Sequence, residues 1–342
     1  MSKKNIERLV FGIFALCVVA FLMIAPYFLL PQINSARNEW LKNAPNDAIF
    51  LELWEIDTFE GGSASRARFL EKRAFEYQTK SKNAYVIVRT VELEQAKNLL
   101  SQGARPDMVS FGIGAGDTLR SFCKPIGSVD GVRGDLLAGG RSEGELLAVP
   151  WCMGGYVLCS KDKIDRLDTE TLTKLKERKE NKVIGVGQAY NLPKYAMDKS
   201  IRSFVEMTDF TQYQAYETYL SGNEFEILLG TQRDLFRLNN KSKLGLIDSV
   251  NYHFLGEYTD LIQYMAITTE DERQADAAKG FLNFLVSETV QKKLTTIGMF
   301  CVNNDKIYSE KVYQQFEEAL SNKLQVMNVF VSNVWLKEEQ AK

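Results

Sequence analysis

Residues that could carry out covalent chemistry are few in this chain of 342 residues. The sequence has one histidine, His253, so a histidine-based catalytic triad or a multi-histidine metal site would have to use it. No HExxH motif or paired-histidine spacing surrounds it, and the five cysteines form no CxxC pair. Two carboxylates could act as in a glycosidase, but no spacing singles out a pair of acids. The sequence therefore predicts no enzyme, metal site or cofactor.

The overall charge and composition narrow the possible partners. The chain has 42 Lys and Arg against 44 Asp and Glu, a net charge of -2, so we expect no nucleic-acid surface. The hydrophobic fraction of 45% and the charged fraction of 25% are ordinary for a globular protein. No group of Tyr and His residues indicates an iron site, and no basic cluster in the sequence indicates an anion site. A metal, polyamine or phosphate ligand nevertheless stays open.

The N-terminus has the pattern of a membrane segment. Residues 1–8 include Lys3, Lys4 and Arg8, and residues 9–30 form an uncharged apolar run. About 20 apolar residues can cross a bilayer as a helix, and a basic flank stays in the cytoplasm. We therefore expect a cell-membrane protein with a cytoplasmic N-terminus, a transmembrane anchor over 9–30, a linker over 31–47 and an extracytoplasmic main body. A cleaved signal segment and a lipoprotein attached at Cys17 are the alternatives.

The elements that would position a binding site begin after this linker. Buried strands are predicted over residues 48–56, 85–91 and 107–114. Between each strand and the next, apolar residues recur at helical spacing, so a helix is predicted there. The order strand, helix, strand, helix, strand predicts a parallel sheet with crossover helices. Ligands of such sheets bind beyond the C-terminal ends of the strands. This rule indicates the loops 55–62, 90–92 and 111–117.

The remaining chain alternates strands with helices and then becomes helical. Strands are predicted over residues 145–151, 155–160, 182–190, 225–230, 244–250 and 260–269. A charged helix is expected from Thr169 to Lys182, and later helices run to Gly298. Apolar residues from Val312 to Trp335 recur near 3.6-residue spacing, so the terminal part is also expected to be helical.

Four stretches resemble the extracellular solute-binding proteins of ABC importers, in the carbohydrate-type group. They are FLELWEI, GARPDMVSFGIG, ELLAVPWCMGGYVLCSKDKI and ADAAKGFLNFLVSETVQKKLTTIGMFCV, in this order. The resemblance implies an α/β, two-lobed periplasmic-binding-protein-like fold of type II, here with an N-terminal transmembrane helix. It implies a first lobe over 48–155 plus 251–342, with the C-terminal helices, and a second lobe over 156–250 that is short for the family.

The resemblance also implies a function. A membrane-anchored solute-binding protein would capture a sugar or oligosaccharide by closing its lobes and would deliver it to ABC permease subunits. The membrane helix and the short second lobe leave an alternative, a sensor or assembly component beside a membrane partner. An extracytoplasmic glycosidase is a further alternative.

Several candidate ligand contacts follow from the rule for strand ends. Trp54 closes the first strand, Asp57 and Glu60 lie in the next loop as hydrogen-bond acceptors, and Gly112 lies in a glycine-rich loop. Tyr264, on a later strand, could offer a stacking ring. Core packing is the alternative for the aromatic residues, and a solvated loop or helix cap is the alternative for the acids.

The resemblance implies the other candidates. Trp151 would stack on a sugar ring at the hinge, and Gly154 and Gly155 would let the backbone approach the ligand and absorb hinge rotation. The alternative for Trp151 is packing between the lobes. Thr231, Gln232 and Arg233 would stand at a helix N-terminus that faces the cleft.

Overall fold

The structure, a computed structural model, describes residues 47–81, 83–161, 168–178, 182–188, 191–222, 224–303, 308–320 and 324–342. The predicted anchor over 9–30, Cys17 and the linker up to residue 46 lie outside these residues. Among the described residues, no helix is both long enough and apolar enough to span a bilayer. The chain divides into a unit of residues 1–48 and a unit of residues 49–342, and the description below concerns the second unit.

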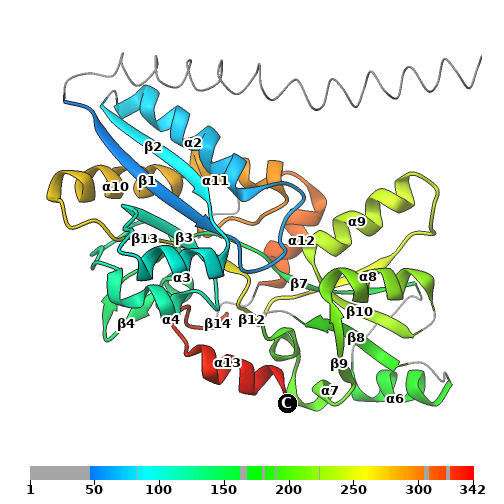
Figure 1. The fold of residues 1–342 in the computed structure, drawn as a ribbon. Coiled ribbons are helices and arrows are strands. Elements are labelled where there is room, and N and C mark those ends of the chain that lie inside the picture. The colour runs from blue at the N-terminus through cyan, green and yellow to red at the C-terminus, as the bar shows by residue number, and fades with distance from the viewer. Residues whose placement is uncertain are drawn as a thin grey trace, which may run out of the picture. The chain divides into compact units, whose positions relative to one another are not determined.

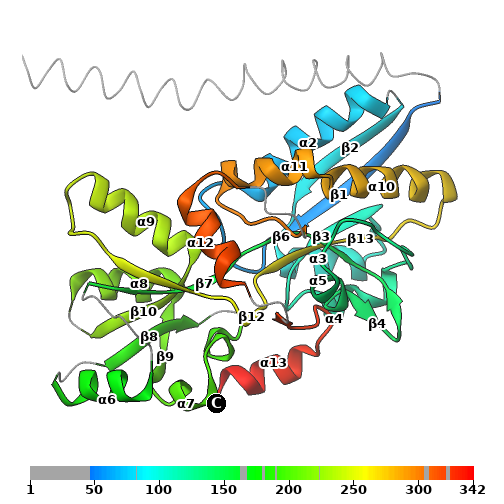
Figure 2. The ribbon, with the colours of Figure 1, turned by 180° about the vertical axis from the view of Figure 1, so that it is seen from behind.

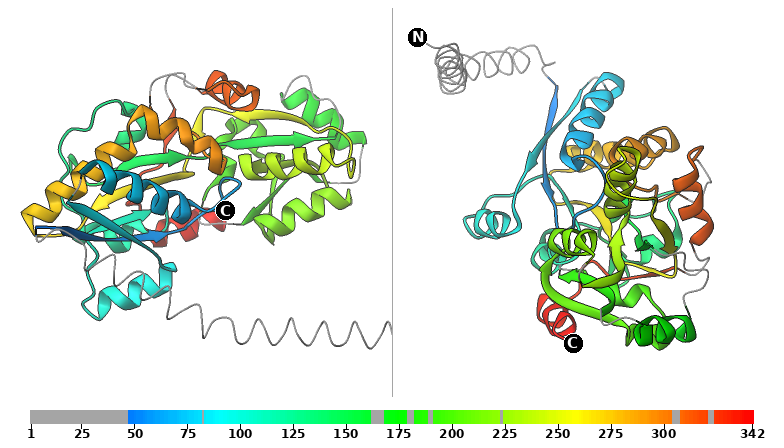
Figure 3. Two further views of the ribbon diagram at one scale, coloured as in Figure 1. Left: turned by 90° about the horizontal axis from the view of Figure 1, so that it is seen from above. Right: turned by 90° about the vertical axis from the view of Figure 1, so that its right-hand side faces the viewer.

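The first sheet has the strand order β2-β1-β3-β13-β6. Its strands are β1 (Ile49–Ile56), β2 (Ala84–Thr90), β3 (Met108–Phe111), β6 (Val149–Met153) and β13 (Ile262–Ile267). β1 pairs in parallel with β2 and β3, as predicted, and β13 runs antiparallel between β3 and β6. Helices α2 (Arg66–Ser81) and α10 (Glu272–Leu285) cover one face, and α3 (Leu93–Ser101) lies on the other (Figure 3). We call this sheet with its helices the first lobe.

The second sheet has the strand order β11-β7-β10-β8-β9. Its strands are β7 (Tyr156–Ser160), β8 (Lys182–Gln188), β9 (Val205–Thr211), β10 (Phe225–Thr231) and β11 (Asn251–Leu255). Helices α6 (Thr169–Arg178), α8 (Gln212–Ser221) and α9 (Gln232–Lys243) pack against it (Figure 1). We call this sheet with its helices the second lobe.

The strand boundaries of the second lobe differ from the expectation. β11 pairs with β7, so residues 251–255 belong to the second sheet, although we expected the first lobe to resume at residue 251. The strand predicted over 244–250 is absent, because α9 runs to Lys243 and Gly245 then takes a positive φ of 70°. Both differences place the end of the second sheet a few residues later in the chain.

Two extended segments connect the sheets. β6 passes through Gly154 and Gly155 into β7, and β11 returns through β12 (Tyr258–Thr259) into β13 (Figures 1 and 2). The β6 segment is fixed to the C-terminal chain, because Met153 and Phe300 form an antiparallel bridge. The cysteines at 123, 152, 159 and 301 are buried and free, so Cys152 and Cys159 form no disulfide across this bend.

The C-terminal part consists of several short elements. They are α11 (Glu288–Gln291), η3 (Lys292–Ile297), α12 (Lys311–Ala319), β14 (Gln325–Val326) and α13 (Asn333–Gln340). The helical spacing from Val312 to Trp335 is interrupted because Gln325 and Val326 pair with β12, and because the Ser332 side chain caps a new helix. Figures 1 and 2 both show α13 running from the first lobe toward the second.

The remaining short elements lie mainly at the margins of the two sheets. They are α4 (Gly116–Leu119), η1 (Arg120–Phe122), α5 (Gly134–Ala138), β4 (Arg141–Ser142), β5 (Glu145–Leu146), η2 (Pro193–Ala196) and α7 (Lys199–Arg202).

Candidate functional site

A cavity of about 560 Å³ lies between the two lobes, and we call it the interlobe cavity. From the first lobe it is lined by Asp57, Thr58, Phe59, Glu60, Gly61, Ser63, Ala64, Ser65 and Arg66, and from the second by Thr211, Gln212 and Arg233. The first set follows β1 and begins α2, so it stands at the C-terminal end of the central strand. Sheets of this kind bind ligands at that edge.

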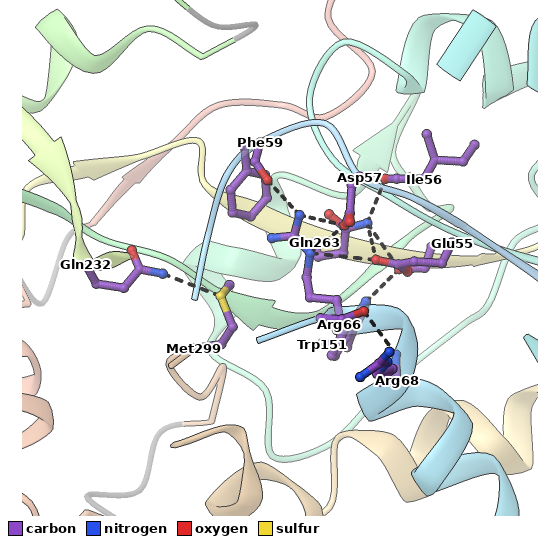
Figure 4. Close-up of polar contacts among 12 residues, drawn as sticks. Glu55, Ile56, Asp57, Phe59, Arg66, Arg68, Trp151, Gln232, Gln263 and Met299 are labelled. Atoms are coloured by element: carbon purple, nitrogen blue, oxygen red, sulfur yellow. Dashed lines mark hydrogen bonds and ion pairs between the residues drawn. The ribbon is translucent and has the colours of Figure 1, made fainter. Parts of the chain in front are cut away.

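The first-lobe wall is built around the guanidinium of Arg66. Its Nε donates to Asp57 Oδ1 at 2.8 Å, and its Nη2 donates to the Phe59 carbonyl at 2.7 Å. The guanidinium carbon also lies 4.2 Å from the centroid of the Phe59 ring (Figure 4). Arg66 is 3% exposed, and its Nη1 donates no hydrogen bond in the described structure. The wall therefore carries a buried cation with a free donor.

A buried carboxyl lies directly beneath this wall. Glu55 is fully buried, and its Oε1 lies 3.7 Å from Arg66 Nε and accepts from Gln263 Nε2 at 3.3 Å. Burial, followed by the charge of Asp57, raises the pKa of Glu55 well above its usual value. The Gln263 amide also donates to the Ile56 carbonyl at 3.0 Å, which ties β1 to β13 (Figure 4). This network holds the end of β1, and hence the loop after it, in place.

Ion pairs join the two walls of the interlobe cavity. Glu60 Oε2, from the first lobe, lies 3.7 Å from Arg233 Nε and 3.4 Å from Arg237 Nη2 in α9. The start of α9 is fixed by a capping box in which the Thr231 amide donates to Asp234 Oδ2 at 2.9 Å. Burial raises the pKa of Asp234 to about 6. Arg233 is therefore presented to the cavity by a well-anchored helix terminus.

Three helices begin at the interlobe cavity. Ser65 and Arg66 start α2, Thr211 and Gln212 start α8, and Arg233 lies in the first turn of α9. Helix N-termini carry partial positive charge and point backbone N–H groups at bound acceptors. The cavity thus combines donors from three helices with the carboxylates of Asp57 and Glu60, which suits a small polar ligand with several oxygen atoms.

The aromatic candidates do not reach the cavity. Trp151 is fully buried, donates from Nε1 to Ser110 Oγ at 2.9 Å and stacks on Phe69 at 6.0 Å between ring centroids. Trp54 is 1% exposed, and its Nε1 donates to Glu52. The predicted stacking role of Trp151 is therefore wrong for this structure, and Trp54 is also a packing residue.

Tyr264 and Gly112 have structural roles as well. Tyr264 is buried in β13 and its hydroxyl donates to the Leu136 carbonyl at 3.2 Å, so it offers no ring to a ligand. A Cβ atom on Gly112 would lie 2.3 Å from Thr58 Oγ1, so glycine is needed there for the close approach of the Thr58 side chain. Gly112 thus supports the cavity wall from behind.

Gly154, Gly155 and Gln232 form the connection between the lobes. The Gly155 backbone N–H donates to the Gln232 side-chain Oε1 at 2.9 Å. The Gln232 backbone N–H donates in return to the Gly155 carbonyl oxygen at 3.1 Å. A Cβ atom on Gly155 would lie 2.2 Å from the Phe316 ring, so the close approach requires glycine there. Gln232 is fully buried and its Nε2 also contacts Met299 Sδ at 3.4 Å (Figure 4). These residues hold the crossover segment and do not line the cavity.

Among the predicted candidates, Asp57, Glu60 and Arg233 line the interlobe cavity. The sequence analysis indicated the loop 55–62, which contains Thr58 and Phe59, but named neither of them as a candidate. It missed Arg66 in the first lobe and Thr211 and Gln212 in the second. Arg66 follows the indicated loop 55–62 by four residues, at the start of the predicted helix, so extending the loop to the helix terminus would have included it. Nothing in the sequence marks Thr211, because its strand, β9, was not predicted.

Neither a metal cluster nor the single histidine contributes to the described wall of the interlobe cavity. No group of three or more His, Cys, Asp or Glu side chains among them could hold a metal ion. His253 lies on β11 and is not among the residues that line the interlobe cavity. The geometry is that of a binding cavity with charged and hydrogen-bonding walls.

The fold is similar to that of known binding proteins. The sugar-binding protein MalE of Xanthomonas citri superposes with a TM-score of 0.63 at 10% identity, over 85% of this chain and 89% of that one. An ABC substrate-binding protein of Listeria monocytogenes in complex with cycloalternan gives 0.57 at 8%, over 86% and 93%. The Atu4243-GABA receptor gives 0.58 at 12%, over 86% and 96%. At these low identities, the superpositions show a shared fold alone.

Comparisons of sequence gave no further relative. No protein-family model matches the chain, and no curated protein matches it.

Proposed function

We propose that this chain is an extracytoplasmic solute-binding protein that holds a small polar molecule in the interlobe cavity and delivers it to an ABC importer. The observation that carries the proposal is that residues from both lobes line one cavity, with Asp57 and Arg66 on one wall and Arg233 on the other. Solute-binding proteins bury ligands by closing two lobes around them. Ligand binding would then add contacts between lobes that already meet through Glu60.

A carbohydrate is the ligand class that we propose first. One of the similar structures is a sugar-binding protein and another was determined in complex with cycloalternan, and hydroxyl groups suit a wall of carboxylates, arginines and helix N-termini. The third is described as a GABA receptor, so the fold also accommodates other polar solutes. No aromatic ring other than Phe59 belongs to the described lining, so hydrogen bonds would dominate recognition.

The anchoring belongs to this proposal as well. The basic flank and the apolar run over residues 9–30 support a chain held at the cell membrane with its main body outside. Permease subunits would then be its membrane partners. A sensor or assembly component would have the same arrangement without transport.

The test is a titration of the full-length chain with monosaccharides, oligosaccharides and small amino acids, followed by calorimetry and by melting temperature. We expect saturable binding by one solute class and a matching rise in melting temperature. Arg233→Ala should weaken binding at least tenfold, because it removes a charged contact from the cavity wall. Arg273→Ala, an exposed arginine on α10 away from the cavity, is the matched control and should have no effect.

Two outcomes would contradict the proposal. A flat response to the whole panel would favour the sensor or assembly alternative. Equal weakening by Arg233→Ala and Arg273→Ala would place the binding site outside the interlobe cavity.

A further inference from the structure

A second cavity, of about 480 Å³, lies on the first lobe between α2 and η3, and we call it the basic cavity. Its charged lining residues are Arg68, Lys72, Arg73 and Lys293, and none of its described lining residues is acidic. Three of these residues lie within positions 68–73 of one predicted helix, and Lys293, more than 200 positions after Lys72, joins them only through folding. The fold therefore adds a fourth basic residue, from η3, to three that α2 already brings together.

The helix α2 supplies most of this charge from one face. Each of the helical residues Arg68, Phe69, Lys72 and Arg73 has another member of this set three or four positions away, and Ser65 precedes the helix by one residue, so together they form a single stripe along the helix. Like charges four residues apart, such as Arg68 and Lys72, repel each other and disfavour the helix. An anion bound between Arg68 and Lys72 would attract both side chains and offset their mutual repulsion.

Arg73 is the member of the stripe whose buried N–H groups lack hydrogen-bond acceptors. It is 7% exposed, its Nη2 pairs with Glu76 Oε1 at 2.8 Å, and its guanidinium carbon lies 4.9 Å from the Phe69 ring centroid. Its Nε and Nη1 are buried and donate no hydrogen bond in the described structure. Burial lowers the pKa of Arg73, because removal from water disfavours its charged form.

Glu76, one helical turn after Arg73, already pairs with two of the basic residues that line the cavity. Glu76 accepts from Lys293 Nζ at 3.0 Å in addition to its pair with Arg73. The single carboxylate of Glu76 therefore pairs with both Arg73 and Lys293. The other two basic lining residues, Arg68 and Lys72, are exposed to solvent. The remaining donors of Arg73 need an acceptor from outside the chain or from water.

We propose that the basic cavity is a binding site for an oxyanion, with a tetrahedral phosphate or sulfate group as its ligand chemistry. Such a group presents several acceptor oxygens to converging Arg and Lys donors, and charge-assisted hydrogen bonds are the strong ones. Ala64 and Ser65 line both this cavity and the interlobe cavity, on two sides of the start of α2. The site is therefore adjacent to the proposed solute site but has its own set of charged residues.

The test is a calorimetric titration of the full-length chain with inorganic phosphate and, separately, with sulfate, at constant ionic strength set with sodium chloride. We expect saturable binding of both anions, beyond any response to chloride. The double variant Arg68→Gln/Lys72→Gln should weaken phosphate binding at least tenfold while keeping the melting temperature, since both side chains are exposed. Arg73→Gln should abolish binding, and its melting temperature is checked in parallel because Arg73 is buried.

Lys243→Gln provides the control, because it removes one positive charge from an exposed position on α9 that lines neither cavity. It should leave phosphate affinity within twofold. The proposal is overturned if phosphate responds no more than chloride, which would mean that water alone satisfies Arg73. It is equally overturned if Lys243→Gln weakens binding as much as the double variant, or if Arg233→Ala abolishes phosphate binding and the double variant does not.

Discussion

At the scale of single residues, the buried carboxyl of Asp234 should set part of the pH dependence of stability. Burial raises the pKa of Asp234 to about 6 in the folded protein, whereas the pKa of an Asp in an unfolded chain is about 3.9. The folded protein holds this proton more tightly, so the associated stability is fully present below about pH 4 and is lost as the pH rises through about 6. The difference corresponds to about 2–3 kcal/mol.

The variant that isolates this effect is Asp234→Asn, which keeps an acceptor for the Thr231 amide and cannot titrate. Relative to the variant, the wild-type chain should lose about 2–3 kcal/mol of unfolding free energy between pH 4 and pH 8. Urea denaturation at each pH measures both free energies. A difference between the two proteins that stays constant with pH would contradict the prediction.

Trp151 should contribute to stability and not to ligand affinity. It is fully buried, stacks on Phe69 and donates to Ser110, so Trp151→Phe keeps most of the packing and loses the hydrogen bond. We expect the unfolding free energy to fall by about 1–3 kcal/mol and the solute affinity to stay within about twofold. Trp335→Phe is the control, because that side chain is 37% exposed. Loss of binding in a stable Trp151→Phe protein would restore a ligand role.

The residue scale also shows where sequence reasoning ends. The rule for strand ends indicated the loop that holds Asp57 and Glu60, and this loop lines the interlobe cavity at the end of β1, which pairs in parallel with β2 and β3. Whether an aromatic residue near that edge faces the core or the cavity depends on pleat direction and on partners far along the chain. Trp151 turns toward Ser110, 41 positions earlier in the sequence, and no local pattern encodes that contact.

At the scale of elements, α13 should stabilise the chain by joining the lobes. Leu336 is 1% exposed and clusters with Ile113 of the first lobe and Leu192 of the second. The Glu339 carboxylate and carbonyl accept from Tyr195 Oη and Lys194 Nζ. Leu336→Ala should lower the unfolding free energy by about 2–5 kcal/mol, because it leaves a cavity in this cluster.

Chemical denaturation of Leu336→Ala beside Val334→Ala tests the role of α13. Val334 is 66% exposed on the same helix, so its truncation should cost less than about 0.5 kcal/mol. Equal changes in unfolding free energy for the two substitutions would show that the packing of Leu336 does not stabilise the contact of α13 with the two lobes.

The elements themselves were predicted unevenly. The three parallel strands of the first sheet stand out because they are short apolar runs bounded by polar loops. β9 and β11 were missed because VEMTDFT and NYHFL mix polar and apolar residues and gain their pairing from neighbours. Periodicity near residues 312–335 predicted helix, but pairing of Gln325 with Tyr258 decided the local structure.

At the scale of the whole molecule, the contacts between the lobes differ in how readily water could replace them. Asp260, beside β12, is buried, and its carboxylate accepts from Tyr156 Oη at 2.5 Å, Tyr258 Oη at 2.9 Å and the Leu192 amide at 2.6 Å. Burial raises its pKa, so breaking this cluster would expose a carboxyl adapted to the interior. The pairs of Glu60 with Arg233 and Arg237 are partly exposed. Exposed pairs contribute about 0–1 kcal/mol each.

This difference predicts a direction of motion. If the lobes separate, they should part at Glu60 and pivot about Asp260 and Gly155, because partly exposed ion pairs exchange with water at small cost. Glu60→Gln should therefore increase the fraction of separated lobes by about two- to fivefold, which corresponds to about 0.4–1 kcal/mol. Its unfolding free energy should change by less than about 1 kcal/mol.

Tyr156→Phe should instead lower the unfolding free energy by about 1–3 kcal/mol, because it removes a buried hydrogen bond to a carboxylate. Small-angle scattering without added solute would report the separation as a larger radius of gyration for Glu60→Gln, and an unchanged radius in that variant beside an increase in Tyr156→Phe would place the pivot at the opposite side.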